Sequence, residues 1–101
     1  MVVVERLIQQ VHPDKWAELE ALDKKYGAVE SRCGFPAKKR YRCFVGGDNT
    51  NALIIEREWE SLAVMEAAYE KVFAEPEWQA LGAEGIGIIE SDRHEIYVPL
   101  P

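Results

Sequence analysis

The order in which strand-like and helix-like segments follow one another constrains this chain most. Residues 2–11 ("VVVERLIQQV") are rich in β-branched residues and contain no helix or strand breaker, so they predict a strand. A helix, two strand-like segments, a second helix and a last strand follow. This order predicts an α+β fold in which a four-stranded antiparallel sheet carries its helices on one face. Right-handed crossovers place the first and third strands at the centre of that sheet.

The first helix is predicted to begin at "HPD". Pro13 suits the first turn, where its missing N–H would have no partner, and Asp14 favours the positive end of the helix dipole. Apolar residues at three- and four-residue steps then form one buried stripe, namely Trp16, Leu19, Leu22, Tyr26 and Val29. Gly34 and Pro36 end the helix.

The second helix is predicted to follow Ser61, whose hydroxyl can accept a hydrogen bond from a free amide of the first turn. Its apolar stripe consists of Leu62, Met65, Tyr69, Val72 and Phe73. Pro76 begins a short extra turn that contains Trp78 and Leu81, and "GAEGIG" ends all helix.

Residues 38–45 and 52–59 flank the turn-forming stretch "GGDNTN" and predict a β-hairpin. We expect charge to set its register, with Arg42 opposite Glu56 and Arg40 opposite Glu58. Val45 would then face Leu53. The "KKRYR" run is interpreted as an edge strand that charge protects from foreign strands, with a phosphate-binding patch as the alternative.

The last strand is predicted within residues 94–101, at an edge of the sheet because it ends on prolines, whereas residues 86–93 are left open between a lead-in and a short strand. The first strand has apolar residues on both faces, since Val2, Val4 and Ile8 alternate with Val3 and Leu7. We therefore expect a second copy of the chain to cover the face that the helices leave open, about a two-fold axis.

Composition and charge exclude several classes of protein. A chain of 101 residues has room for one core, and its net charge of −6 argues against a general nucleic-acid binder. No apolar run is long enough for a membrane helix, and the N-terminus resembles a strand more than a signal peptide, so we expect a cytoplasmic protein without membrane contact. Cys33 and Cys43 fit no zinc spacing and are expected as reduced thiols.

Two stretches, "EWESLAVMEAAYEKVFAEPEWQAL" and "RHEIYVPL", combine a tryptophan at the end of the third strand, a serine-started helix and a "PEW" turn. This pattern resembles the NIPSNAP family of the dimeric α/β-barrel superfamily, and the resemblance covers nearly the whole chain. It implies one ferredoxin-like βαββαβ domain over residues 1–101 that dimerises through its sheet. It also implies a cavity between helices and sheet, which related antibiotic-biosynthesis monooxygenases and heme-degrading enzymes use for catalysis.

The candidate pocket residues follow from that cavity: Tyr41, Arg57, Trp59, Tyr69 and His94. Aromatic walls with one cation would suit a planar or carboxylated small molecule, although the same residues can also be ordinary core. His94 lies in "SDRHE", where a neighbouring carboxylate could hold it as a general base, or where it could simply be exposed at a strand entrance. His12 is interpreted as a capping or surface residue.

No cofactor and no metal site are expected. The heme-degrading relatives use a histidine near the end of the second helical region, and no histidine lies between Ser61 and Gly87. No nucleophile motif and no histidine–carboxylate cluster with metal spacing occurs. The sequence therefore predicts a homodimeric NIPSNAP-like protein that binds a small hydrophobic or aromatic molecule, with a cofactor-independent monooxygenase or a non-catalytic scaffolding dimer as the alternatives.

Overall fold

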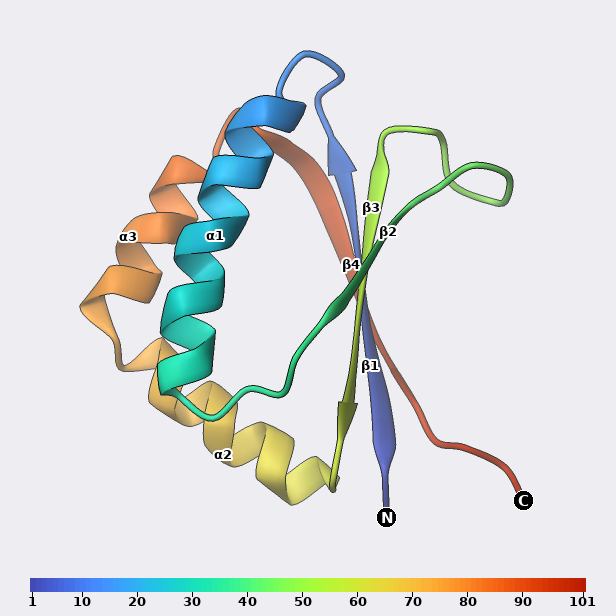
Figure 1. Ribbon diagram of the computed structural model, residues 1–101, viewed down its shortest axis with the longest axis vertical. Helices are drawn as coiled ribbons and strands as arrows, with labels where there is room; N and C mark the ends of the chain where they lie inside the picture. The colour runs from blue at the N-terminus through green and yellow to red at the C-terminus, as the bar shows by residue number, and fades with distance from the viewer.

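Four strands pair into one antiparallel sheet in the order β2-β3-β1-β4 in the computed structural model, which describes residues 1–101. The chain runs through β1 (Val3–Val11), α1 (Trp16–Arg32), β2 (Lys39–Arg42), β3 (Ala52–Trp59), α2 (Leu62–Phe73), α3 (Pro76–Glu84) and β4 (Ile89–Tyr97). All three helices lie on one side of the sheet, and the other side is bare (Figure 1). The predicted α+β, ferredoxin-like fold is confirmed, including β1 and β3 at the centre and β4 at an edge.

The core forms where the helices face the sheet. Alternate residues of β1, from Val3 to Val11, point toward the helices, and so do Leu53, Ile55 and Trp59 of β3. The larger buried cluster joins α1, α2 and α3 to Trp59, and a smaller one joins Leu19 to the other end of the sheet. Since the helices do not pack tightly onto the whole sheet, space remains between these two clusters.

The helix boundaries show which local sequence signals set the ends of the helices. Ser61 caps α2 as predicted, because its hydroxyl accepts from the Val64 amide at 3.1 Å. The first helix instead begins at Trp16, later than predicted, because residues 13–15 form a turn in which the Lys15 amide bonds the His12 carbonyl. The nine residues from Pro76 to Glu84 form the regular helix α3, which is longer than the single turn expected.

The β2–β3 hairpin forms, but its predicted register is wrong by three residues. Arg42 lies opposite Leu53, where Val45 was expected, and β2 ends at Arg42, so that residues 43–51 form a longer loop. Arg40 bonds Glu20 of α1 through two nitrogens, at 2.8 and 2.9 Å, and has no ion pair with Glu58. Exposed cross-strand ion pairs contribute little, so the charge pattern was a weak guide to register.

The last strand spans Ile89–Tyr97, and the residues after Tyr97 lie outside it. The strand thus begins earlier than residue 94. Asp92 and Ser91 pair with Gln9 and Gln10 of β1. Because these residues are polar on both faces of the strand, the sequence lacks the apolar–polar alternation by which a strand is normally predicted. Gly87, at φ 88°, provides the left-handed turn that leads into the strand.

Cys33 and Cys43 are both free thiols. None of the helices combines the length and the apolar character needed to cross a bilayer.

Candidate functional site

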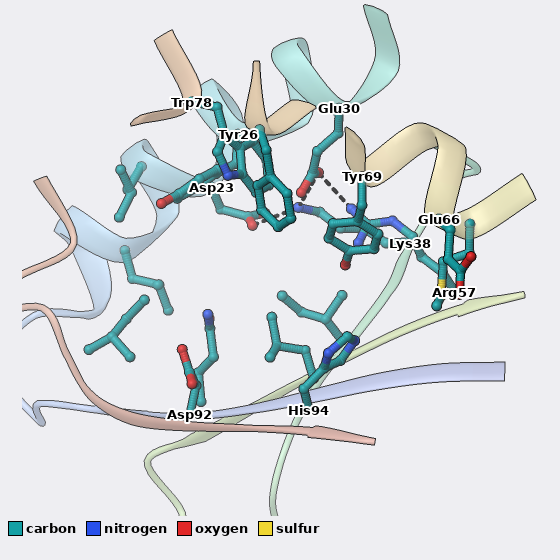
Figure 2. A pocket seen from close by; sticks show the side chains of 18 residues that line it. Asp23, Tyr26, Glu30, Lys38, Arg57, Glu66, Tyr69, Trp78, Asp92 and His94 are labelled. Atoms are coloured by element: carbon teal, nitrogen blue, oxygen red, sulfur yellow. Dashed lines mark hydrogen bonds and ion pairs between the residues drawn. The ribbon is translucent and has the colours of Figure 1, made fainter. Parts of the chain in front are cut away.

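A cavity of about 570 Å³ lies between the helices and the sheet. Eighteen residues line it, ten of them hydrophobic. Leu7 and Ile55 of the central strands line it on the side of the sheet. Tyr26 of α1 and Trp78 of α3 line it on the side of the helices (Figure 2). Tyr26 and Trp78 pack edge to face, with ring centroids 4.8 Å apart. A volume in this range matches the sites that proteins use for small molecules.

The cavity opens between α2 and β4. Of its lining residues, the exposed ones are Glu66 and Phe73 on α2 together with Asp92 and His94 on β4. The lining residues from α1, β1 and β3 are buried or half-buried. The cavity is therefore a pocket with a polar mouth and a mainly apolar interior.

A buried carboxylate organises one wall of the pocket. The side chain of Glu5 is only 3% exposed, yet hydrogen-bond donors surround it. Its Oε1 accepts from the indole Nε1–H of Trp59 at 2.8 Å, and its Oε2 accepts from the Tyr69 hydroxyl and lies 2.7 Å from Nε2 of His94. Burial, followed by the hydrogen bond to Glu5, raises the pKa of Tyr69, so that Tyr69 remains a proton donor at neutral pH.

Arg57 connects this carboxylate to a second one. Its Nη2 lies 2.6 Å from Oε1 of Glu30, its Nη1 lies 4.0 Å from Oε1 of Glu5, and its Nε donates to the Pro36 carbonyl at 3.3 Å. The guanidinium is buried, and each of its nitrogens faces an oxygen. Arg57 is thus a structural link between α1 and β1, already compensated before any ligand arrives.

The C-terminal end of α1 positions the Phe35 ring beside this cluster. The Gly34 amide bonds the Ser31 carbonyl and the Phe35 amide bonds the Glu30 carbonyl, and Gly34 has φ 86°, which together form a Schellman cap. Phe35 then lies over the Arg57 guanidinium at 5.0 Å and packs edge to face on Trp59 and Tyr69. The glycine predicted to stop the helix therefore also aims the ring that covers Arg57.

Three of the four cations in residues 38–42 have partners on α1. Lys38 Nζ lies 2.7 Å from Asp23 and 3.1 Å from Glu30, and Arg40 bonds Glu20. Arg42 stacks on the Trp16 ring, 4.2 Å from its centroid. Lys38, Arg40 and Arg42 thus all have partners within the chain, which argues against the alternative of a phosphate-binding patch; β2 is an edge strand.

The structure brings together four of the five sequence-predicted pocket residues. Arg57, Tyr69 and His94 line the cavity, and Trp59 supports it from the core through its bond to Glu5. Tyr41 is in the wrong place for this pocket. The three-residue shift in the hairpin turns it to the open face opposite Ile54, where it is 49% exposed. A register error by an odd number of residues moves every side chain to the other face.

Glu5 and Glu30 were missed, although the sequence carried a signal for each. Glu5 alternates with Val3 and Leu7, which places it on the covered face, and Glu30 follows Val29 on the buried stripe of α1. Charged residues are rarely buried unless they are paired, so neither was considered. His94 lies in the middle of β4, opposite Leu7, and not at a strand entrance. No group of three or more histidine, cysteine or acidic side chains is arranged to hold a metal ion.

Solved structures with this arrangement include several NIPSNAP proteins. A NIPSNAP family protein from Agrobacterium tumefaciens superimposes with a TM-score of 0.81 at 21% identity, over 98% of this chain and 86% of that one. An uncharacterized NIPSNAP domain protein from Burkholderia xenovorans gives 0.83 at 17% identity, over 97% and 94%. This chain has the NIPSNAP fold. The resemblance expected from the sequence is therefore borne out at the level of the fold.

The same fold extends to an enzyme. SnoaB, a cofactor-independent oxygenase from Streptomyces nogalater, matches this chain with a TM-score of 0.64 at 18% identity, over 99% of this chain and 92% of that one. No family model matches the sequence, and no curated protein does.

Proposed function

We propose that this NIPSNAP-like protein binds a small, mainly apolar molecule in the cavity between its helices and its sheet. The cavity itself supports the proposal. A chain of this size would gain stability by filling such a space with its own side chains, so a space left open points to a ligand. The mouth between α2 and β4 gives a ligand access, and the Glu5 network offers polar contacts beside an apolar interior.

Native mass spectrometry of the purified protein with a panel of aromatic and acyl compounds tests this proposal. Ile89 lines the cavity, so Ile89→Trp should fill it and abolish binding. Ile86→Trp is the matched control, since Ile86 is exposed and lies outside the lining. A cavity that takes up none of the compounds, or equal uptake by both variants, would contradict the proposal.

We also propose that the open face of the sheet binds a second copy of the chain. Val4, Ile8 and Ile54 lie on that face among the paired charges of Arg6 and Glu56, which bond at 2.7 Å. Tyr41 and Tyr97 add exposed aromatic surface. A face of this composition, with alternating apolar residues and internally compensated charges, suits self-association about a two-fold axis.

Analytical ultracentrifugation should give about twice the chain mass of 11.5 kDa at micromolar concentration. Val4→Asp introduces a charge on the central strand of the open face and should produce monomers. Val64→Asp introduces the same charge on the exposed surface of α2 and should leave the dimer intact. A wild-type protein that sediments as a monomer would contradict the covered sheet.

A cofactor-independent oxygenase is the second candidate function. The observation that favours it is His94, whose imidazole a buried carboxylate holds at the mouth of the cavity. Oxygenation without a cofactor requires a substrate anion that can give electrons to dioxygen, and a positioned imidazole can take the substrate proton. SnoaB, with the same fold, has such an activity.

Oxygen consumption with quinol-like substrates distinguishes this candidate from simple binding. His94→Phe should abolish the consumption, whereas Tyr41→Phe should retain it because Tyr41 lies on the opposite face of the sheet. Binding without oxygen consumption would leave the protein as a binding module.

A further inference from the structure

The charges that line the cavity are unevenly distributed. Four carboxylates face it, from Asp23, Glu30, Glu66 and Asp92, against the two permanent cations Lys38 and Arg57. Both cations are already in ion pairs. Lys38 contacts Asp23 and Glu30, and Arg57 contacts Glu30 at 2.6 Å. An anionic ligand would find no free cation in this cavity.

The mouth adds to this bias. Glu66 and Asp92 lie on opposite sides of it, on α2 and β4, and neither forms an ion pair. A ligand carboxylate that entered the cavity would lose its hydration and come close to these like charges. Burying an uncompensated charge in this way is costly. Arg57, which the sequence suggested as the partner of a carboxylated ligand, is therefore not available for that contact.

The imidazole of His94 has one nitrogen without a partner. Nε2 of His94 lies 2.7 Å from the Glu5 carboxylate, which can only accept a hydrogen bond, so the hydrogen of the neutral ring is on Nε2. Nδ1 then has a lone pair and no hydrogen-bond partner in the protein. Glu5 itself already accepts from Trp59 and Tyr69 and is 3% exposed, so it is not offered to a ligand.

The position of His94 sets the direction in which a ligand would lie. His94 is at the mouth, whereas Leu22, Ile55 and Trp78 line the interior. Figure 2 shows the imidazole rising from β4 below Tyr69, with the aromatic rings of Tyr26 and Trp78 above. An apolar body would thus occupy the interior while its polar group remains beside His94.

We propose that the cavity selects neutral aromatic molecules that bear a hydroxyl group, which donates a hydrogen bond to Nδ1 of His94, and that it rejects carboxylates of the same size. This inference rests on the proposed binding function and names the class of ligand. His94 contacts the ligand, and Glu5 is a positioning residue that fixes the neutral ring in the tautomer with its hydrogen on Nε2.

Three probes of matched shape test the selectivity: naphthol, methylnaphthalene and naphthoate, each substituted at the same ring position. Titrations followed by tryptophan fluorescence at neutral pH should rank naphthol first. We expect naphthol to bind about tenfold more tightly than methylnaphthalene, which is the contribution of one good hydrogen bond. Naphthoate should bind more weakly than methylnaphthalene despite its polar group.

His94→Phe should remove the preference for naphthol, because the hydrogen bond to the hydroxyl is lost. It should leave the affinity for methylnaphthalene within about twofold, because the apolar interior is unchanged. His12→Phe is the matched control, since His12 does not line the cavity, and it should keep the wild-type ranking. Glu5→Gln should weaken the preference for naphthol even when the variant folds normally.

Nitrogen NMR of labelled histidine provides a readout that a purely structural role of Glu5 would not change. The wild-type His94 spectrum should show a protonated Nε2 and a free Nδ1, and naphthol should shift only Nδ1. Glu5→Gln should give a mixture of tautomers. A free Nδ1 that naphthol leaves unshifted would overturn the inference.

The outcomes separate the two proposals. If naphthol and methylnaphthalene bind equally, or if naphthoate binds as well as naphthol, the selectivity is wrong and the binding function stands. If none of the three probes binds, both proposals are overturned. The full ranking together with its loss in His94→Phe would establish the selectivity.

Discussion

The two faces of β1 use the same kinds of residue for different purposes. Glu5 points to the helices and is 3% exposed, whereas its neighbour Arg6 points to the open face with 41% of its side chain exposed. Both are charged, and both bond to residues on β3. Glu5 also bonds Tyr69 of α2 and faces His94 of β4, so it connects three elements, while Arg6 mainly contacts its strand neighbours.

The comparison teaches that burial decides the energetic value of a charge in this sheet. A charge that water can reach loses little when its partner is removed, because water takes the place of the partner. A buried charge has no such replacement. The residues that shape the cavity should therefore be sensitive to substitution, and those of the open face should tolerate it in the monomer.

The largest effect is expected for Glu5→Ala. It leaves the Trp59 indole and the Tyr69 hydroxyl without their acceptor, and we expect it to lower the free energy of unfolding by about 3–5 kcal/mol. Urea denaturation followed by circular dichroism measures this. Glu56→Ala, on the other face, should cost no more than about 1 kcal/mol. Equal losses in the two variants would remove the distinction between the faces.

Arg57→Met should have an intermediate effect. The substitution keeps the volume and the apolar stem but removes the cation beside Glu30. Lys38 remains 3.1 Å from Glu30, so that carboxylate is still compensated, and we expect a loss of about 2 kcal/mol in the free energy of unfolding. The double variant Arg57→Met with Lys38→Met should lose more than the sum of the single variants, as double-mutant denaturation curves would reveal.

Alkaline pH should destabilise the covered face more than the open one. Burial raises the pKa of Tyr69, so the folded protein keeps that proton while the unfolded chain releases it near pH 10. Above about pH 10 the unfolded state binds fewer protons, and stability therefore falls as pH rises. Thermal unfolding from neutral to alkaline pH should show a shallower decline in Tyr69→Phe than in the wild type.

Tyr97→Phe provides the matched control for this pH dependence. The hydrogen bond to Glu95 raises the pKa of Tyr97 as well, but Tyr97 lies on the open face, where water screens the interaction. The control should decline as steeply as the wild type. Tyr26, whose pKa burial also raises, remains in both variants, so some alkaline sensitivity should persist in Tyr69→Phe.

The smallest effect is expected for the Arg6–Glu56 ion pair. A double-mutant cycle with alanine should give a coupling energy of roughly 0–1 kcal/mol. In the monomer the coupling should shrink further as salt is added, because both groups are then accessible to ions. A coupling that resists salt would show that the pair is shielded, which is what a second chain on this face would cause.

Much of the fold could be predicted because its signals are local. The apolar spacing of Leu19 and Leu22, the cap at Ser61 and the stop at Gly34 each act within a few residues. The order of elements then leaves few allowed topologies. These signals predicted the correct sheet order.

The errors concern contacts between segments far apart in the chain. The hairpin register was predicted from charge pairs within the hairpin, but Arg40 bonds Glu20 on α1. In the observed register Tyr41 lies on the other face of the sheet. Glu5 was passed over because its partners Tyr69 and His94 lie more than sixty positions away. A local pattern contains no information on such partners.

The sequence by itself determined which segments are helices and strands, and which face of each is apolar, because propensity and periodicity act over a few residues. Only the tertiary structure decided which charges are buried and what they contact. The fate of Glu5, Glu30 and Arg57 depends on three elements meeting at one point, and the cost of burial is offset only when their donors and acceptors arrive together.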